Sequence, residues 1–105
     1  MTELDKLEKY LKANGYNYHR HDEPEIRKNG YIAHCDRHQI LVYDEHGNLL
    51  WDAICQRGSY GYEKGLLEIM GKIVSPGCDV EGWLNAQQII HRLENGLEEK
   101  YKDYD

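Results

Sequence analysis

The chain contains no phenylalanine, and only two prolines and three cysteines occur among its 105 residues. Long apolar runs are absent as well, because nothing approaches the roughly 20 apolar residues that cross a bilayer. The N-terminal segment MTELDKLEKY lacks the apolar stretch of a secretory signal. We therefore expect no membrane partner and a cytoplasmic location, the cytosol of a host cell, where the thiols stay reduced.

A basic excess is also missing, since 19 acidic residues face 13 basic ones and the formal net charge is -6. Proteins that bind nucleic acid usually carry a basic excess, so we expect no direct nucleic-acid partner. The length leaves room for one compact domain and not for two. We predict a single α+β domain over residues 1–97, followed by a frayed acidic tail over residues 98–105.

Nine tyrosines and two tryptophans make up the aromatic content. Tyrosine combines an apolar ring with a polar tip that stays wet, so one interpretation is that it replaces phenylalanine at half-buried positions. The other interpretation is a tyrosine-rich contact surface, because Tyr and Trp are enriched at protein interfaces. In either case the core must depend on leucine, isoleucine and methionine.

The first predicted element is a helix that begins after Thr2, because Thr2 and Asp5 form a variant of the capping box. Asn14-Gly15 then supplies a left-handed stop. Three leucines at helical spacing form the predicted buried stripe of this helix: Leu4, Leu7 and Leu11.

Alternating side chains predict a strand over residues 16–21 and a shorter one over residues 31–35. Residues 22–30, between them, are interpreted as a charged loop. The strongest β pattern is a hairpin with one strand over residues 38–44 and the other over residues 49–56, joined by a glycine-containing turn.

Each strand of this hairpin has two faces, because successive side chains point to opposite sides. Ile40 and Val42 share one face of the first strand, and Trp51, Ala53 and Cys55 share one face of the second. The side chains on the opposite face of the hairpin are also partly apolar. This pattern predicts a central hairpin with helices on one side and a half-covered second side.

Two helices are predicted after the hairpin. Apolar residues at helical spacing place the first over residues 61–73. The second begins after Asn85, with Gln88 in the reciprocal capping position. Asn95-Gly96 ends it, with Leu97 as the C-terminal hydrophobic contact. The predicted order is a helix, an antiparallel β-meander of about three strands, and two helices packed on one sheet face.

Six histidines and three cysteines raise the question of metal or thiol chemistry. His19 and His21 share a strand face, but a zinc site needs three or four converging ligands and no Cys-x-x-Cys pair occurs. Cys35, Asp36 and His38 could act as nucleophile, orienting group and base, yet nothing in the sequence places a base beside the thiol. We predict no metal, no cofactor and no catalytic residues.

The glycine-containing segment Gly58-Ser59-Tyr60-Gly61 lies between a predicted strand and a predicted helix, where backbone N–H groups often hold phosphate. It lacks the Lys and Ser/Thr of a P-loop and the glycine spacing of a dinucleotide fingerprint. One interpretation is a tight turn with Ser59 as the helix cap. The alternative is a small-ligand or nucleotide site that uses Gly58, Ser59 and Gly61.

Acidic residues cluster in the loop after the first strand, in the hairpin turn and at the C-terminal end. A solvated face is the usual explanation for such clusters. The alternative is an acidic surface that competes for a basic groove on another protein, because carboxylates imitate phosphates and speed association. The predicted partner-binding residues are Asp22, Glu23, Glu25, Asp44, Glu45, Glu98, Glu99, Tyr101, Asp103 and Tyr104.

The stretch DRHQILVYDEHGNLLWDAICQRGSYGYEKGLLEIMGKIV, followed by GWLNAQQIIHRLE, resembles a family of small uncharacterised proteins of phages and mobile elements of Gram-positive anaerobes. The resemblance covers residues 36–94 and implies an accessory protein of the kind that inhibits host defence systems. The predicted order of elements is also similar to that of anti-CRISPR inhibitors that act as acidic DNA mimics, which is an analogy of topology alone.

We therefore expect a non-enzymatic, protein-binding inhibitor whose acidic, tyrosine-rich surface blocks a host protein with a basic nucleic-acid-binding groove. A CRISPR effector nuclease is the expected target. One alternative is a small-ligand or nucleotide-binding domain that uses the segment 58–61. Another is a structural or regulatory subunit that forms a homodimer through an uncovered sheet face bearing Tyr43 and Trp51.

Overall fold

The computed structural model describes residues 1–96, so the predictions for Leu97 and for the tail over residues 98–105 lie outside the described residues. The elements in chain order are α1 (Glu3–Ala13), β1 (Asn17–Glu23), β2 (Ile26–Lys28), β3 (Tyr31–His34), β4 (Arg37–Tyr43), β5 (Leu49–Gln56), the 3-10 helix η1 (Tyr62–Lys64), β6 (Leu67–Gly71), β7 (Val80–Leu84) and α2 (Ala86–Asn95). The α+β class is confirmed, whereas the predicted count of about three strands is too low. Within this range no helix is long and apolar enough to cross a membrane.

Helix α1 forms as its sequence predicts. The Asp5 N–H donates to Thr2 Oγ1 at 3.0 Å, and the Thr2 N–H donates to Asp5 Oδ2 at 2.9 Å, which together complete the capping box. The predicted leucine stripe is buried. Asn14 caps the other end, and Gly15 follows with a left-handed φ of 72°.

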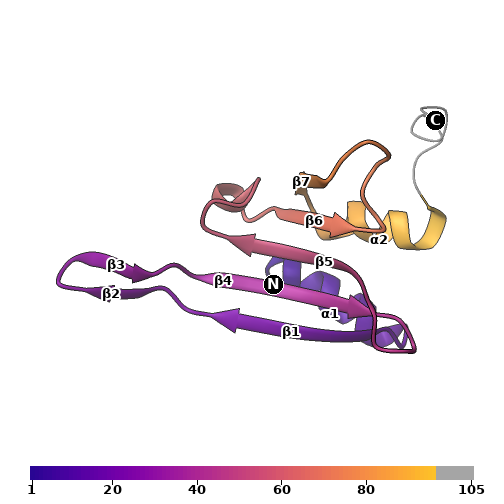
Figure 1. Ribbon diagram of the computed structural model, residues 1–105, viewed down its shortest axis with the longest axis horizontal. Helices are drawn as coiled ribbons and strands as arrows, with labels where there is room; N and C mark the ends of the chain where they lie inside the picture. The colour runs from indigo at the N-terminus through magenta and orange to yellow at the C-terminus, as the bar shows by residue number, and fades with distance from the viewer. Residues whose placement is uncertain (97–105) are drawn as a thin grey trace.

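The main sheet is antiparallel throughout, in the order β1-β4-β5-β6-β7 (Figure 1). The predicted central hairpin is confirmed as β4 and β5, with Ile40 opposite Ala53. Asp44 closes its turn, because one carboxylate oxygen accepts from the backbone N–H groups of His46 and Asn48, each at 2.8 Å. Strand β1 lies on the other side of β4, with Arg20 opposite Ile40.

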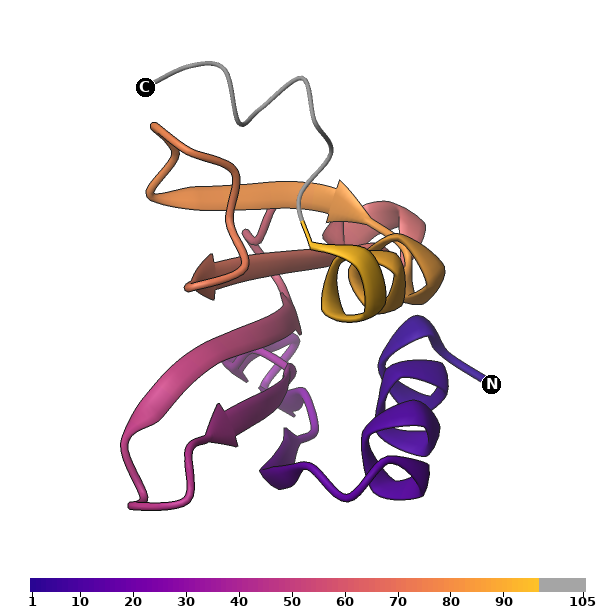
Figure 2. The same ribbon diagram turned by 90° about the vertical axis from the view of Figure 1, so that its right-hand side faces the viewer.

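Both helices cover the same face of the sheet (Figure 2). The core lies between that face and the helices, and it contains leucine, isoleucine, valine, alanine and one tryptophan. Its buried members are Leu4, Leu7, Leu11, Ile40, Val42, Trp51, Ala53, Leu67, Ile69, Leu84, Ala86 and Ile89. As expected for a chain without phenylalanine, Tyr10, Tyr16 and Tyr18 pack half-buried around it.

The uncovered sheet face does not carry Trp51, so the dimer surface predicted from Tyr43 and Trp51 is wrong in that residue. Trp51 pairs across the hairpin with Val42, and directly opposed residues share a face. It therefore points toward the helices and is only 4% exposed.

The helix predicted over residues 61–73 is also wrong, because η1 and β6 occupy that range. Gly61 and Gly65, with left-handed φ values of 95° and 70°, stand at the two ends of η1 and limit it to one turn. Beyond it, Leu67 and Ile69 are buried on one face of β6, which is the period of a strand. Strand β7 lies between the two predicted helices, where no strand was predicted, and it pairs with β6.

Strands β2 and β3 form a separate two-stranded sheet, here called the arm (residues 26–34), which continues β1 and β4 away from the body (Figure 1). Every strand residue of the arm is exposed. Asn29 and Gly30 turn the chain with φ values of 52° and 81°, as in the tight turns of hairpins. The arm corrects the prediction of a loop over residues 22–30.

Helix α2 begins as predicted, with Asn85 and Gln88 in a complete capping box. Its first N–H group, on Ala86, donates to Glu3 Oε1 at 2.8 Å, which ties the start of α2 to the first turn of α1. Gly96 follows the last turn, and its N–H donates to the Arg92 carbonyl at 2.8 Å.

Candidate interaction sites

The predicted acidic residues at the base of the arm are each held by arginine or histidine side chains of the same chain. Asp22 contacts Arg20 Nε at 3.0 Å and His38 Nδ1 at 2.7 Å. Burial alone would raise the pKa of Asp22, but the hydrogen bonds from His38 and Arg20 lower it. Glu25 accepts from Arg27 at 2.8 Å and from Arg57 at 2.7 Å.

Glu23, between these two residues, contacts histidine side chains from two strands. Its carboxylate lies 2.9 Å from His21 Nε2 and 3.5 Å from His34 Nε2. The hydrogen bond from His21 is the main cause that lowers the pKa of Glu23. The carboxylates at the base of the arm are thus already partnered by arginine and histidine side chains.

The other predicted acidic residues lie elsewhere. Asp44 serves the hairpin turn, and the hydrogen bond from the Asn48 N–H is the main cause that lowers its pKa. Glu45 is exposed beside it. Because β1 and β4 are antiparallel, Asp22 lies opposite the start of β4, at His38, and Asp44 follows its end. The acidic residues therefore form two separate groups, and the tail members Glu98, Glu99, Tyr101, Asp103 and Tyr104 lie outside the described residues.

A row of potentially reactive side chains crosses the helix-covered face of the sheet. Asp22, His38 and Cys55 stand opposite one another on β1, β4 and β5 and line a cavity of about 370 Å³. Besides Asp22, the imidazole of His38 has Asp36 at 3.5 Å from Nε2. Burial and, second, the charge of Asp36 raise the pKa of the Cys55 thiol. The thiol is therefore kept protonated, the opposite of what a nucleophile needs.

This row replaces the trio considered from the sequence. Cys35 is exposed, and the thiol opposite His38 belongs to Cys55, which the register of the predicted hairpin could have shown. Within residues 1–96, no group of three His, Cys, Asp or Glu side chains is arranged to hold a metal ion.

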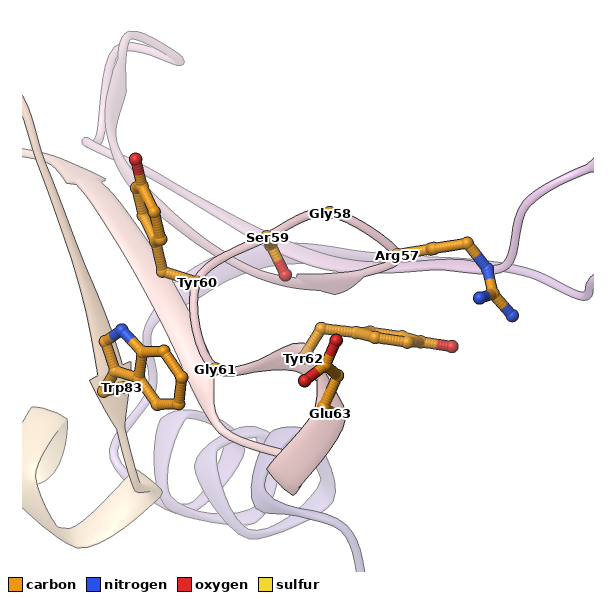
Figure 3. Close-up of a pocket in the computed structure, with 8 residues that line it drawn as sticks. All are labelled: Arg57, Gly58, Ser59, Tyr60, Gly61, Tyr62, Glu63 and Trp83. Atoms are coloured by element: carbon orange, nitrogen blue, oxygen red, sulfur yellow. The ribbon is translucent and has the colours of Figure 1, made fainter.

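The predicted glycine segment lines a hollow of about 210 Å³, bounded by residues 57–63 and Trp83 (Figure 3). Ser59 does not cap a helix, which corrects that prediction. Its hydroxyl accepts from the Gln56 N–H at 3.0 Å and donates to the Gln56 carbonyl at 2.7 Å, so it closes a turn. Only the single turn η1 follows, and the segment therefore lacks the helix dipole that favours phosphate.

Two exposed aromatic side chains border this hollow, Tyr60 at 58% and Trp83 at 54% exposure. The backbone N–H of Trp83 donates to the Tyr60 carbonyl at 3.3 Å. A Cβ on Gly82 would lie 2.2 Å from Tyr60 Cβ, and one on Gly61 would lie 2.8 Å from Leu66 Cβ. The turn after β5 is thus packed directly against the backbone of β7.

Trp83 also has a left-handed backbone, with φ 62°, which bulky residues rarely adopt. Trp83 was not among the site residues predicted from the sequence. The Gly82-Trp83 pair was the available signal, because a glycine beside a large aromatic residue permits a close backbone approach. Its partner Tyr60 could be identified only through the pairing of β6 and β7.

We compared the chain with protein-family models, curated proteins and solved structures. No family model, no curated protein and no solved structure matches it.

Proposed function

We propose that this protein is a non-enzymatic inhibitor that binds another protein through its arm. The observation that carries the proposal is the exposure of Ile26, Tyr31 and Ile32 on two strands that contribute nothing to the core. Tyr31 is 78% exposed. Large apolar side chains left exposed on a projecting element are typical of an interaction surface.

The energetics of a two-stranded hairpin support this use. An isolated hairpin is marginally stable in water, and the arm has no helix against it (Figure 1). Its strands nevertheless carry exposed isoleucine and tyrosine, where polar residues would make the protein more soluble. A partner that covers these side chains would gain roughly 25 cal/mol for each Å² of apolar surface removed from water.

The contact is apolar and aromatic more than acidic. Asp22, Glu23 and Glu25 are held by arginine or histidine side chains of the chain itself, and a partner could use them only by breaking these pairs. The net charge of -6 would still speed encounter with a basic surface. We place the partner among nucleic-acid-handling defence proteins, with a CRISPR effector nuclease as the first to test, on this charge and on the resemblance to phage and mobile-element proteins.

A cleavage assay with such a nuclease tests the proposal. The arm variant combines Tyr31→Ala with Ile32→Ser, and the matched control is Leu49→Ser, which removes another exposed apolar side chain, at the start of β5. We expect the wild type and the control to block cleavage. The arm variant should need a concentration at least about tenfold higher for the same inhibition, as for the loss of an interface hot spot. Unimpaired inhibition by the arm variant, or none by the wild type, would contradict the proposal for that nuclease.

A further inference from the structure

We propose that the hollow bordered by Tyr60, Trp83 and Glu63 receives an arginine side chain of the partner protein. This inference rests on the proposed function, because it names a contact that the bound partner would make. The proposed occupant of the 210 Å³ hollow is a cation, whereas the phosphate considered for the glycine segment is an anion.

The aromatic rings supply a surface on which a guanidinium can stack. Figure 3 shows Tyr60 and Trp83 on one side of the hollow, with Tyr62 and Glu63 on the other. A guanidinium is planar and stacks on aromatic faces, and Trp and Tyr rings attract it electrostatically. The close approach of Gly82 to Tyr60 holds the backbones that carry the two exposed rings side by side, so both rings border the same hollow.

One carboxylate in the hollow, that of Glu63, is placed to bind a cation. Glu63 lines it and is exposed, and within residues 1–96 its carboxylate has no ion pair or hydrogen bond. Arg57 also lines the hollow, and its guanidinium lies 5.9 Å from the centre of the Tyr62 ring. It points away from the two exposed rings, Tyr60 and Trp83 (Figure 3), and binds Glu25 at 2.7 Å. A phosphate would be repelled by Glu63, whereas a guanidinium would meet an unpartnered carboxylate.

The chain already places a cation near one of these rings. Lys64 Nζ lies 5.9 Å from the centre of the Trp83 ring, which is within the range of a cation–π contact. This internal ammonium would compete with an incoming guanidinium. Removal of Lys64 should therefore strengthen the binding of arginine, an effect that a purely structural role of the hollow would not produce.

Nuclear magnetic resonance of the full chain tests the proposal with N-acetyl-argininamide as the probe. The two tryptophans give two indole N–H signals, of which Trp83 reports the hollow and the buried Trp51 is the internal control. N-acetyl-citrullinamide, which has nearly the same shape without the charge, is the matched neutral probe. We expect a saturable shift of the Trp83 signal with the arginine probe and little change with citrulline or at Trp51.

Three variants sharpen the test. Glu63→Gln and Tyr60→Ala should each weaken arginine binding by about threefold to fivefold, and Lys64→Met should strengthen it by a similar factor. Equal shifts with both probes, no saturable shift, or unchanged affinity in Glu63→Gln would overturn the proposal. If inhibition depends on the arm but the Trp83 signal does not respond to the arginine probe, this inference alone is contradicted and the proposed function is not.

Discussion

Trp83 combines a strained backbone with an exposed ring, and folding alone accounts for neither. A left-handed φ of 62° costs a bulky residue roughly 1–3 kcal/mol. With the residue 54% exposed, burial of the side chain offsets only part of that strain energy. Glycine would adopt the same backbone without strain, so selection for stability alone favours glycine at this position. The proposed contact with an arginine of the partner would account for a tryptophan at this position.

We predict that the Trp83→Gly variant is more stable than the Trp83→Ala variant. Both substitutions remove the ring, but alanine keeps the left-handed strain and glycine relieves it. We expect the free energy of unfolding to be about 1 kcal/mol higher for the glycine variant, as measured by urea denaturation.

The matched control for this prediction is Met70, an exposed residue of β6 whose φ is not positive. At Met70 the order of stability should reverse, with Met70→Gly less stable than Met70→Ala, because glycine weakens a strand. Equal stabilities of the two Trp83 variants, beside a normal order at Met70, would show that position 83 carries no strain.

Gly61 offers a second prediction at the level of single residues. Gly58 and Gly61 have nearly the same left-handed φ, 96° and 95°, but a Cβ on Gly58 meets open space and one on Gly61 meets Leu66 Cβ at 2.8 Å. Gly58→Ala should therefore lose about 1 kcal/mol through backbone strain alone. Gly61→Ala should lose about 1–3 kcal/mol more through overpacking. Thermal unfolding of the two variants measures the difference, and equal losses would mean that Leu66 yields without cost.

Among the elements, those defined by local signals were predictable. Helices α1 and α2 have capping boxes that the sequence displays, at Thr2 and at Asn85. The hairpin β4–β5 shows a clear alternation and a turn residue, Asp44, that accepts from the backbone N–H groups of the turn. In each case the hydrogen bonds that fix the element join residues close in the sequence, so the local pattern was sufficient.

The elements that depend on distant partners were missed. The apolar residues of β6 fit a helical period as well as a strand, and pairing of Ala53 with Ile69 decides between the two. Strand β7 depends in turn on β6. The arm had a local signal, since Asn29-Gly30 is typical of a hairpin turn, but the charged residues around it suggested a loop.

Helix α2 is fastened to the strands by an ion pair that predicts a pH dependence. Arg92 binds Glu81 through both terminal nitrogens and also donates to the Ile73 carbonyl. The hydrogen bond from Arg92 is the main cause that lowers the pKa of Glu81 from 4.5 to about 2. Because the folded pKa lies below the unfolded one, the stabilisation is complete above about pH 4.5 and is lost as the pH falls toward 2.

Glu81→Gln should therefore lower the free energy of unfolding at pH 7 by roughly 1–2 kcal/mol. The difference between variant and wild type should shrink as the pH falls toward 2. Denaturant unfolding between pH 7 and pH 2 measures both effects. Some slope remains in the variant, since hydrogen bonds from Thr2 and Arg20 lower the pKa of Asp5 to about 2 as well. The control is Glu45→Gln in the exposed turn, and a constant difference across this pH range would contradict the assignment to Glu81.

At the scale of the whole molecule, the sequence showed which residues carry charge but not whether each charge was available. Asp22, Glu23 and Glu25 each have one partner two residues away in the chain: Arg20, His21 and Arg27. Each also has a second partner from another strand or from the turn after β5: His38, His34 and Arg57. Pairing of that kind depends on the register of the sheet. The same long-range order brings Trp83 to Tyr60, which no local pattern places together.

The elongated shape, with extents of 52 × 29 × 25 Å, separates the arm from the core, and this separation yields the last prediction. Replacing residues 25–35 by Asn-Gly would join β1 to β4 through a short turn and remove the arm. None of the deleted residues belongs to the core, and the exposed ion pair between Glu25 and Arg57 contributes at most about 1 kcal/mol. The melting temperature should then fall by no more than about 8 °C, while inhibition of the nuclease is lost. Loss of folding in this variant would mean that the arm is a structural element, and inhibition that survives its removal would move the contact to the body of the protein.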